Sequence, residues 1–156
     1  HCFTLVWINE QKQVGEINTF SIVKAARRFK DARPASKPTF AEYTTFLSAG
    51  LRDKKKERYV RLRTWWAGND ARRKSGRSIP MTDIEAANLR AFAALLNEKD
   101  DNDRLMKAEA FRELGMFEDA EALLATRFDE GMMQAVGIIR SLNQDRHTTV
   151  AEMKFR

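Results

Sequence analysis

The sequence contains little cysteine, proline or glycine, and each shortage narrows the choice of fold. Of its 156 residues, one is cysteine, three are proline and seven are glycine. The lone Cys2 cannot form an internal disulfide, so a disulfide-stabilised scaffold is excluded and a reducing, cytoplasmic setting is expected. Few helix-breaking residues, together with abundant alanine, leucine, glutamate, arginine and lysine, favour α-helix over β-sheet.

Long apolar runs are also missing. No run approaches the ~20 residues that a bilayer-spanning helix needs, so the sequence predicts neither a membrane span nor a secretory signal. Hydrophobic residues make up 43% of the chain and aromatic residues 10%, which suffices for the core of one domain. The chain begins with His1 and Cys2 rather than methionine, from which we expect it to be a piece of a longer protein.

Charge is spread unevenly along the chain, whose formal net charge is +6. Residues 24–77 contain 17 lysine or arginine residues and 5 acidic residues, whereas residues 78–156 contain 10 and 15. The basic part predicts attraction to an acidic partner or to phosphates. An intramolecular match between the basic part and the acidic part is the alternative interpretation.

Three regions follow from the pattern of residue types. The β-branched and aromatic run from Phe3 to Ile8 predicts a short strand, within an N-terminal region of residues 1–23. Residues 24–38 are basic and contain two prolines, which indicates an extended linker. Residues 39–156 are predicted to form an all-α domain of antiparallel helical hairpins.

Two capping boxes mark helix starts in this domain. Thr39 precedes Glu42 by three residues, and Thr82 precedes Glu85 in the same way. Helices are expected from Thr39 to near Gly50, from Lys54 to Asp70, from Thr82 to about Asn97, from near Arg104 to Leu114, from Phe117 to Leu124 and from about Met132 to Leu142.

Helix ends are predicted from glycine and from acidic clusters. Gly68-Asn69-Asp70 is interpreted as the end of the second helix, followed by a flexible basic link over residues 71–78. The acidic residues 100–103 are placed to cap the helix that follows them, because anions are favoured at the positive N-terminal end of a helix.

The best-defined element is a hairpin over residues 108–124. Gly115 stands where its first helix must end, because glycine enters the left-handed conformation without a Cβ penalty. The small residues Ala108 and Ala120 are expected at the helix crossing, and Phe111 and Phe117 beside them.

This hairpin resembles a tetratricopeptide repeat. The small, aromatic and turn positions of that family match Ala108, Phe111, Gly115, Phe117 and Ala120, with Leu124 after them. Arg127 stands where the family prefers another alanine, and no second copy of the signature appears about 34 residues away. The resemblance therefore implies a tetratricopeptide-like fold rather than a regular array.

The chain as a whole is similar to a group of uncharacterised bacterial proteins with a zinc ribbon followed by helices. The shared motifs are Tyr59-Val-Arg-Leu-Arg-Thr-Trp-Trp-Ala-Gly-Asn-Asp70 and Leu114-Gly-Met-Phe-Glu-Asp-Ala120. The resemblance implies that Cys2 belongs to the last metal-binding pair of a truncated ribbon. It implies structural zinc in the intact protein and no cofactor in this fragment, since a zinc site needs four ligands.

Trp65 and Trp66 are adjacent, so on a helix they point about 100° apart. They cannot both lie at the centre of one interface, and one of them is expected to be partly exposed. A ligand-binding lip beside Asn69 and Asp70 is the functional alternative to core packing.

A protein-interaction or scaffolding module is the function that this sequence favours. The predicted contact residues for an acidic protein or peptide are the following: Arg58, Arg61, Trp66, Arg72 and Arg73. A nucleic-acid-associated protein, binding phosphates through its basic half, is the alternative. We expect no enzymatic activity, because His147 has no candidate nucleophile near it in sequence and no phosphate-binding glycine loop occurs.

Overall fold

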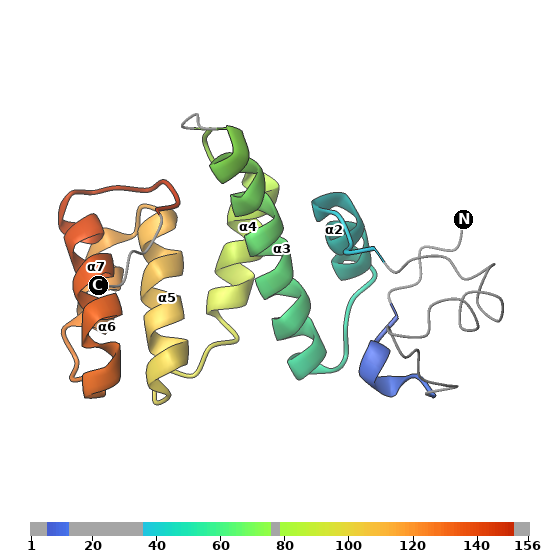
Figure 1. Cartoon of the computed structure of the whole chain (residues 1–156), viewed down its shortest axis with the longest axis horizontal. Helices are drawn as coiled ribbons and strands as arrows, with labels where there is room; N and C mark the ends of the chain where they lie inside the picture. Colours follow the sequence, from blue (N-terminus) through green and yellow to red (C-terminus); the bar gives the residue numbers. More distant parts are fainter. Residues whose placement is uncertain (1–5, 13–35, 76–78, 152–156) are drawn as a thin grey trace, which may run out of the picture.

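The computed structural model describes residues 6–12, 36–75 and 79–151, and this part of the chain is all-α, with no strand in it. Within these described residues, six α-helices and two short 3-10 helices follow one another (Figure 1). In order they are η1 (Ile8–Glu10), α2 (Phe40–Ser48), α3 (Lys54–Ser75), α4 (Asp83–Ala93), α5 (Asp101–Glu113), α6 (Phe117–Leu124), η3 (Glu130–Met132) and α7 (Met133–Gln144).

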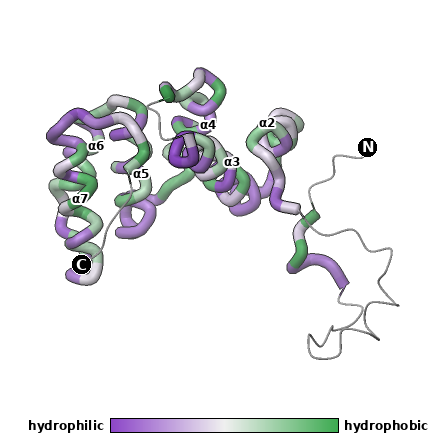
Figure 2. The backbone as a smooth tube through the Cα atoms, turned by 45° about the horizontal axis from the view of Figure 1, so that its top comes forward, coloured by the Kyte–Doolittle hydropathy of each residue, from purple (hydrophilic) through white to green (hydrophobic). Residues whose placement is uncertain are grey.

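Helices that are consecutive in sequence are also neighbours in space. Each helix from α2 to α7 packs on the next, and α5 also contacts α7. The result is a row with α2 at one end and α6 and α7 at the other (Figure 1). Apolar and polar residues are mixed along every helix (Figure 2), and none of the described helices is long and apolar enough to cross a membrane.

Two apolar clusters hold the row together. One joins α4 to α5 around the fully buried Leu89 and Phe92, with Leu62 and Trp65 of α3 packed against it. The other joins α5, α6 and α7, and its buried members are Ala108, Leu124, Phe128, Val136 and Ile139. Helix α5 contributes to both clusters and so links the two halves of the row.

The predicted strand over Phe3–Ile8 is wrong where it can be checked. Val6 and Trp7 are irregular, and Ile8 begins η1. The carbonyl of Trp7 accepts local hydrogen bonds from the Glu10 amide and the Gln11 side chain, at 3.0 and 3.2 Å, which leaves it no strand partner. Residues 1–5 and 13–35, which include Cys2 and most of the predicted linker, lie outside the described residues.

Both predicted capping boxes are confirmed. The Glu42 carboxylate accepts a bond from the Thr39 amide at 2.7 Å, and the Thr39 hydroxyl accepts one from the Glu42 amide at 3.3 Å. Thr82 and Glu85 repeat this arrangement with the same two distances at the start of α4. Each box satisfies amide groups that have no partner within the helix.

The predicted hairpin turn is also confirmed. Gly115 has φ of 75°, and the amides of Gly115 and Met116 donate to the carbonyls of Arg112 and Phe111 in a Schellman motif. Ala108 and Ala120 are fully buried between α5 and α6, as expected. Phe111 and Phe117 are half-buried, and Phe111 packs against the cluster of Leu89 and Phe92 rather than against that of Ala108.

Three helix boundaries differ from prediction. Helix α3 continues through Gly68-Asn69-Asp70 to Ser75, so both the predicted stop and the flexible start of the basic link are wrong. Helix α4 ends at Ala93 rather than near Asn97. Helix α5 begins at Asp101, with the Asp100 side chain accepting a bond from the Asp103 amide at 2.9 Å as its N-cap.

Candidate functional site

Three of the five predicted contact residues are partly buried and pair with other side chains of the molecule. Arg58 forms an ion pair with Asp103 of α5. Arg61 pairs with Glu57 at 2.8 Å and donates to Asn88 of α4 at 3.4 Å. Arg72 pairs with Glu85 of α4 at 2.6 Å. Arg58 and Arg72 of the basic half therefore pair with acids of the acidic half, as the intramolecular interpretation expects, and Arg61 reaches Asn88 there.

The other two predicted residues lie on a different side of α3. Trp66 and Arg73 are exposed, and with Tyr59, Arg63 and Asp70 they form one line along the helix, at steps of four and three residues. We call these five residues the open face of α3. Sequence reasoning missed Tyr59 and Arg63 as members, although their spacing from Trp66 carried the signal.

The open face carries two large, exposed rings. Tyr59 is 50% exposed and Trp66 is 42% exposed. Trp65 instead packs on Phe92 at a ring-centroid distance of 5.8 Å, so the expectation that one tryptophan of the pair is partly exposed is confirmed. The Arg63 guanidinium lies 5.4 Å from the centre of the Trp66 ring, within cation–π range.

The side chain of Arg63 also interacts with α2. A side-chain hydrogen bond with the buried Tyr43 raises the pKa of Arg63. At the far end of the face, Arg73 and Asp70 pair with each other at 2.6 Å. The open face is thus a row of rings and cations that ends in an ion pair.

Behind the open face, a polar network fills the junction of α3, α4 and α5. The Glu113 carboxylate accepts bonds from the indole of Trp65 at 2.8 Å and from the amide of Asn69 at 3.0 Å. Burial raises the pKa of Glu113 to about 7, against the opposing effect of the Trp65 bond. The Asn69 oxygen in turn accepts a bond from Arg72 at 3.0 Å, which connects the network to α4 through Glu85.

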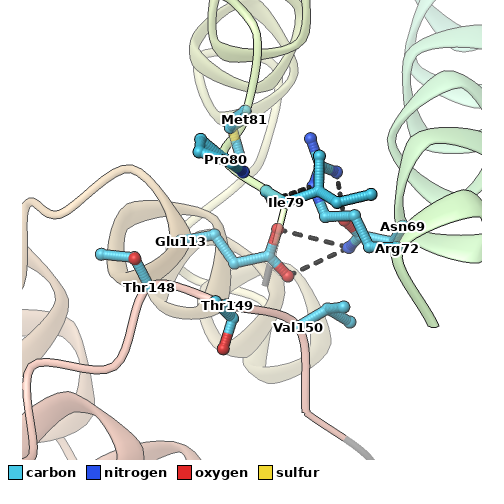
Figure 3. A pocket seen from close by; sticks show the side chains of 9 residues that line it. All are labelled: Asn69, Arg72, Ile79, Pro80, Met81, Glu113, Thr148, Thr149 and Val150. Atoms are coloured by element: carbon cyan, nitrogen blue, oxygen red, sulfur yellow. Dashed lines mark hydrogen bonds between the residues drawn. The ribbon is translucent and has the colours of Figure 1, made fainter. Parts of the chain in front are cut away.

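The network continues toward the C-terminal segment. Arg112 is fully buried, pairs with Glu109 at 2.6 Å and donates to the backbone carbonyls of His147 and Thr149. This segment closes a cavity of about 50 Å³ beside Glu113, and Figure 3 shows Thr148, Thr149 and Val150 on one side of it. Ligand pockets usually measure about 300–1,000 Å³, so this cavity has room for waters rather than for an organic substrate.

Side-chain contacts explain why Gly68, Asn69 and Asp70, which predicted a helix end, lie inside α3. A Cβ on Gly68 would lie 2.4 Å from Glu85 Oε1, so the glycine leaves room for the Glu85 carboxylate to lie against α3 and pair with Arg72. Asn69 is buried against Glu113, and Asp70 pairs with Arg73. At Gly68 and Asn69, residue types that commonly end a helix are therefore explained by contacts distant in sequence.

Among the described residues, no group of three or more His, Cys, Asp or Glu side chains is placed to hold a metal ion. His147 contacts Thr149 through its ring and Arg112 through its carbonyl. The zinc site at Cys2 stays a prediction, because Cys2 lies outside the described residues.

No protein-family model, curated protein or solved structure matches this chain. Its function is therefore inferred from the arrangement of its own side chains.

Proposed function

We propose that this chain is a non-enzymatic protein-interaction or scaffolding module that presents the open face of α3 to an acidic protein or peptide. The observation that carries the proposal is the pair of half-exposed rings, Tyr59 and Trp66, on one face with Arg63 between them. Tryptophan, tyrosine and arginine are the residues most enriched where truncation weakens protein interfaces.

The charge of α3 indicates the chemistry of the partner. Residues 54–75 include nine lysine or arginine residues and two acidic residues. Arg58, Arg61 and Arg72 pair with acids of this chain, and Arg63 is turned toward Trp66. Lys55 and Lys74 are exposed, and no ion pair forms at either within the described residues. A partner bearing carboxylates would be drawn to this surface and oriented on it.

The rest of the row supports the open face as a scaffold. The opposite side of α3 is tied to α4 by Arg72 and to α5 by Arg58 and Trp65. A surface whose side chains are already ordered loses less conformational entropy on binding. The tetratricopeptide-like reading of the hairpins belongs to this proposal, because stacked hairpins are a common support for peptide recognition.

A display selection tests the proposal. Random peptides are selected on the immobilised full chain and then counter-screened on a Tyr59→Ala/Trp66→Ala double variant. We expect enriched peptides that bind the chain and lose at least about tenfold in affinity for the double variant. The matched control is Ile84→Ala/Met133→Ala, which removes two exposed apolar side chains elsewhere. Failure to enrich any peptide, or equal losses in both variants, would contradict the proposal.

Nucleic-acid binding is the competing function, and the basic half of the sequence is what favours it. A labelled single-stranded oligonucleotide, titrated at 50 and 200 mM salt, separates the two. Binding of a single strand through about six phosphates would weaken about 300-fold over this range. Tight, steeply salt-dependent binding of the oligonucleotide, together with a selection that enriches no peptide, would replace the peptide proposal with this one. The ring variants can weaken that binding too, because bases stack on exposed rings.

A further inference from the structure

The open face of α3 continues a pattern that begins one turn earlier, at Lys56. A cation precedes an aromatic residue by three positions twice along α3, as Lys56 and Tyr59 and again as Arg63 and Trp66. The two pairs are seven residues apart, which is two helical turns, so they lie on the same face. We call them the first pair and the second pair.

The first pair is occupied by the chain's own N-terminal segment. The ring of Trp7 packs on the ring of Tyr59 with centroids 5.5 Å apart. The ammonium of Lys56 lies 5.1 Å from the centre of the Trp7 ring and 2.5 Å from the carboxylate of Glu10. One ring and one carboxylate, three residues apart, therefore satisfy both members of the first pair.

The short helix η1 places Trp7 and Glu10 so that both can contact the first pair at once. Trp7 is the N-cap of η1, and Glu10 is its last residue. In a 3-10 helix, residues three apart lie above one another, so the ring and the carboxylate leave the segment on the same side. The remainder of the segment is lightly held, and Ile8 is 78% exposed. The contact is thus made by two side chains and a single turn of backbone.

The second pair also consists of a cation and an aromatic residue, but it has no such occupant among the described residues. The ring of Trp66 is 42% exposed, and its ring contact is with Arg63, seven residues beyond Lys56. No aromatic residue or carboxylate of the described residues lies on Trp66 as Trp7 and Glu10 lie on the first pair.

We propose that the second pair, Arg63 and Trp66, binds a partner-protein segment with an aromatic residue followed three residues later by a carboxylate. The aromatic ring packs on Trp66 and the carboxylate binds Arg63, in the geometry that Trp7 and Glu10 adopt on Tyr59 and Lys56. This inference rests on the proposed function and specifies the ligand of the same face.

The occupant of the first pair favours such a peptide over a nucleic acid. Rings beside cations also suit single-stranded nucleic acid, whose bases stack on aromatic side chains while its phosphates bind cations. On the first pair, however, Lys56 binds the carboxylate of Glu10 at 2.5 Å, and farther along the face Arg73 is already neutralised by Asp70 at 2.6 Å. A segment with one carboxylate per ring matches this spacing.

A synthetic peptide with the sequence of residues 3–12, Phe-Thr-Leu-Val-Trp-Ile-Asn-Glu-Gln-Lys, is the probe. It is labelled with fluorescein, and its anisotropy is measured against the full chain. We expect Trp66→Ala to weaken binding about tenfold or more, and Ile84→Ala to leave it unchanged. Melting curves of both variants establish that they are folded.

A second pair of measurements locates the carboxylate. A peptide with Gln in place of its Glu should bind the wild-type chain more weakly. On an Arg63→Gln chain the two peptides should bind equally, because the group that distinguishes them is gone. If the Gln peptide binds the Arg63→Gln chain more weakly than the Glu peptide does, by the same factor as on the wild type, the assignment of the carboxylate to Arg63 is overturned.

Stoichiometry tests the role of the first pair. Calorimetry should find one peptide per wild-type chain and two per Trp7→Ala chain, because that variant vacates Tyr59 and Lys56. One peptide per chain in both would overturn the equivalence of the two pairs. Self-association that Trp66→Ala abolishes would make the occupant a second copy of this chain instead. If display-selected peptides depend on Trp66 but lack the aromatic–acid spacing, this inference fails while the proposed function stands.

Discussion

The indole of Trp65 donates a hydrogen bond to the carboxylate of Glu113, 48 residues later, over 2.8 Å. This bond joins α3 to α5 across the interior, and Asn69 supports it from the next turn of α3. The carboxylate is nevertheless costly to ionise, because burial raises its pKa to about 7. The native state at neutral pH is therefore close to the midpoint of this titration.

We expect Glu113→Gln to change the pH dependence of stability. The folded-state pKa is raised from its ordinary value of 4.5 to about 7, so the native state binds this proton more tightly than the unfolded chain does. The contribution of Glu113 to the free energy of unfolding is full below pH 4.5 and is lost as the pH rises to about 7. The total is about 3 kcal/mol. Urea denaturation of both chains from pH 4 to pH 8 measures it.

The quantity to follow is the difference in the free energy of unfolding between the wild type and Glu113→Gln at each pH. Glutamine keeps an oxygen that can accept the Trp65 bond and does not ionise. The stability of the variant relative to the wild type should therefore rise between pH 4.5 and 7, and the difference should be constant above pH 8. A difference that stays flat over the whole range would show that Glu113 titrates as an ordinary exposed carboxyl.

Helix caps and turns that depend on residues close in sequence could be predicted from the sequence. The caps at Thr39 and Thr82 and the turn at Gly115 each depend on hydrogen bonds within about five residues, which a sequence motif can encode. The partial exposure of one of Trp65 and Trp66 followed from helix geometry alone.

The polar network could not be predicted in this way. Asn69 and Glu113 are 44 residues apart, and Arg58 and Asp103 are 45 apart. Neither separation leaves a periodic signal in the sequence. For the same reason Arg58, Arg61 and Arg72 were expected at a partner surface, whereas the fold pairs them with its own acids and amides.

A comparison of two helical glycines tests the explanation for Gly68. At Gly137, in the exposed side of α7, an added Cβ meets nothing within 4 Å. Gly137→Ala should therefore stabilise the chain by up to about 1 kcal/mol through helix propensity. At Gly68 the Cβ would displace the Glu85 carboxylate, which serves both the α4 capping box and Arg72.

We expect Gly68→Ala to lower the free energy of unfolding by about 1–2 kcal/mol despite the better propensity of alanine. Chemical denaturation of the two variants gives the comparison directly. Stabilisation by both would mean that Glu85 moves aside at little cost. In that case the close approach of α3 and α4 would not be the reason for glycine at position 68.

Arg112 is expected to hold the C-terminal segment against α5. Its fully buried guanidinium pairs with Glu109 and donates to the carbonyls of His147 and Thr149. Arg112→Met leaves these groups buried without a donor, so we expect a loss of about 3–5 kcal/mol. Hydrogen exchange should accelerate first in residues 147–150.

The matched variant for this measurement is Arg90→Met, which changes an exposed arginine of α4. Its effect on stability should stay within about 0.5 kcal/mol. Equal effects of the two substitutions would contradict a special role for Arg112. Unchanged exchange in residues 147–150 of Arg112→Met would show that other contacts hold the segment.

Two helix ends with the same geometry should respond in opposite ways to substitution. Gly115 and Arg146 both have positive φ, of 75° and 51°, at the residue after a helix cap. An added Cβ at Gly115 would meet only Thr148 Cγ2, at an ordinary 3.8 Å. The cost of Gly115→Ala is therefore that of the backbone conformation, about 1–2 kcal/mol, and thermal denaturation measures it.

Arg146 bears this cost already, because it is the one non-glycine residue with positive φ among those that the structure describes. Arg146→Gly should be neutral or should raise the free energy of unfolding by up to about 1 kcal/mol. The exposed ion pair that it loses, with Glu118 at 2.8 Å, contributes little. Arg146→Ala keeps the strained backbone and removes the same ion pair, so it isolates that contribution. Destabilisation by Arg146→Gly beyond that of Arg146→Ala would refute the backbone explanation for both helix ends.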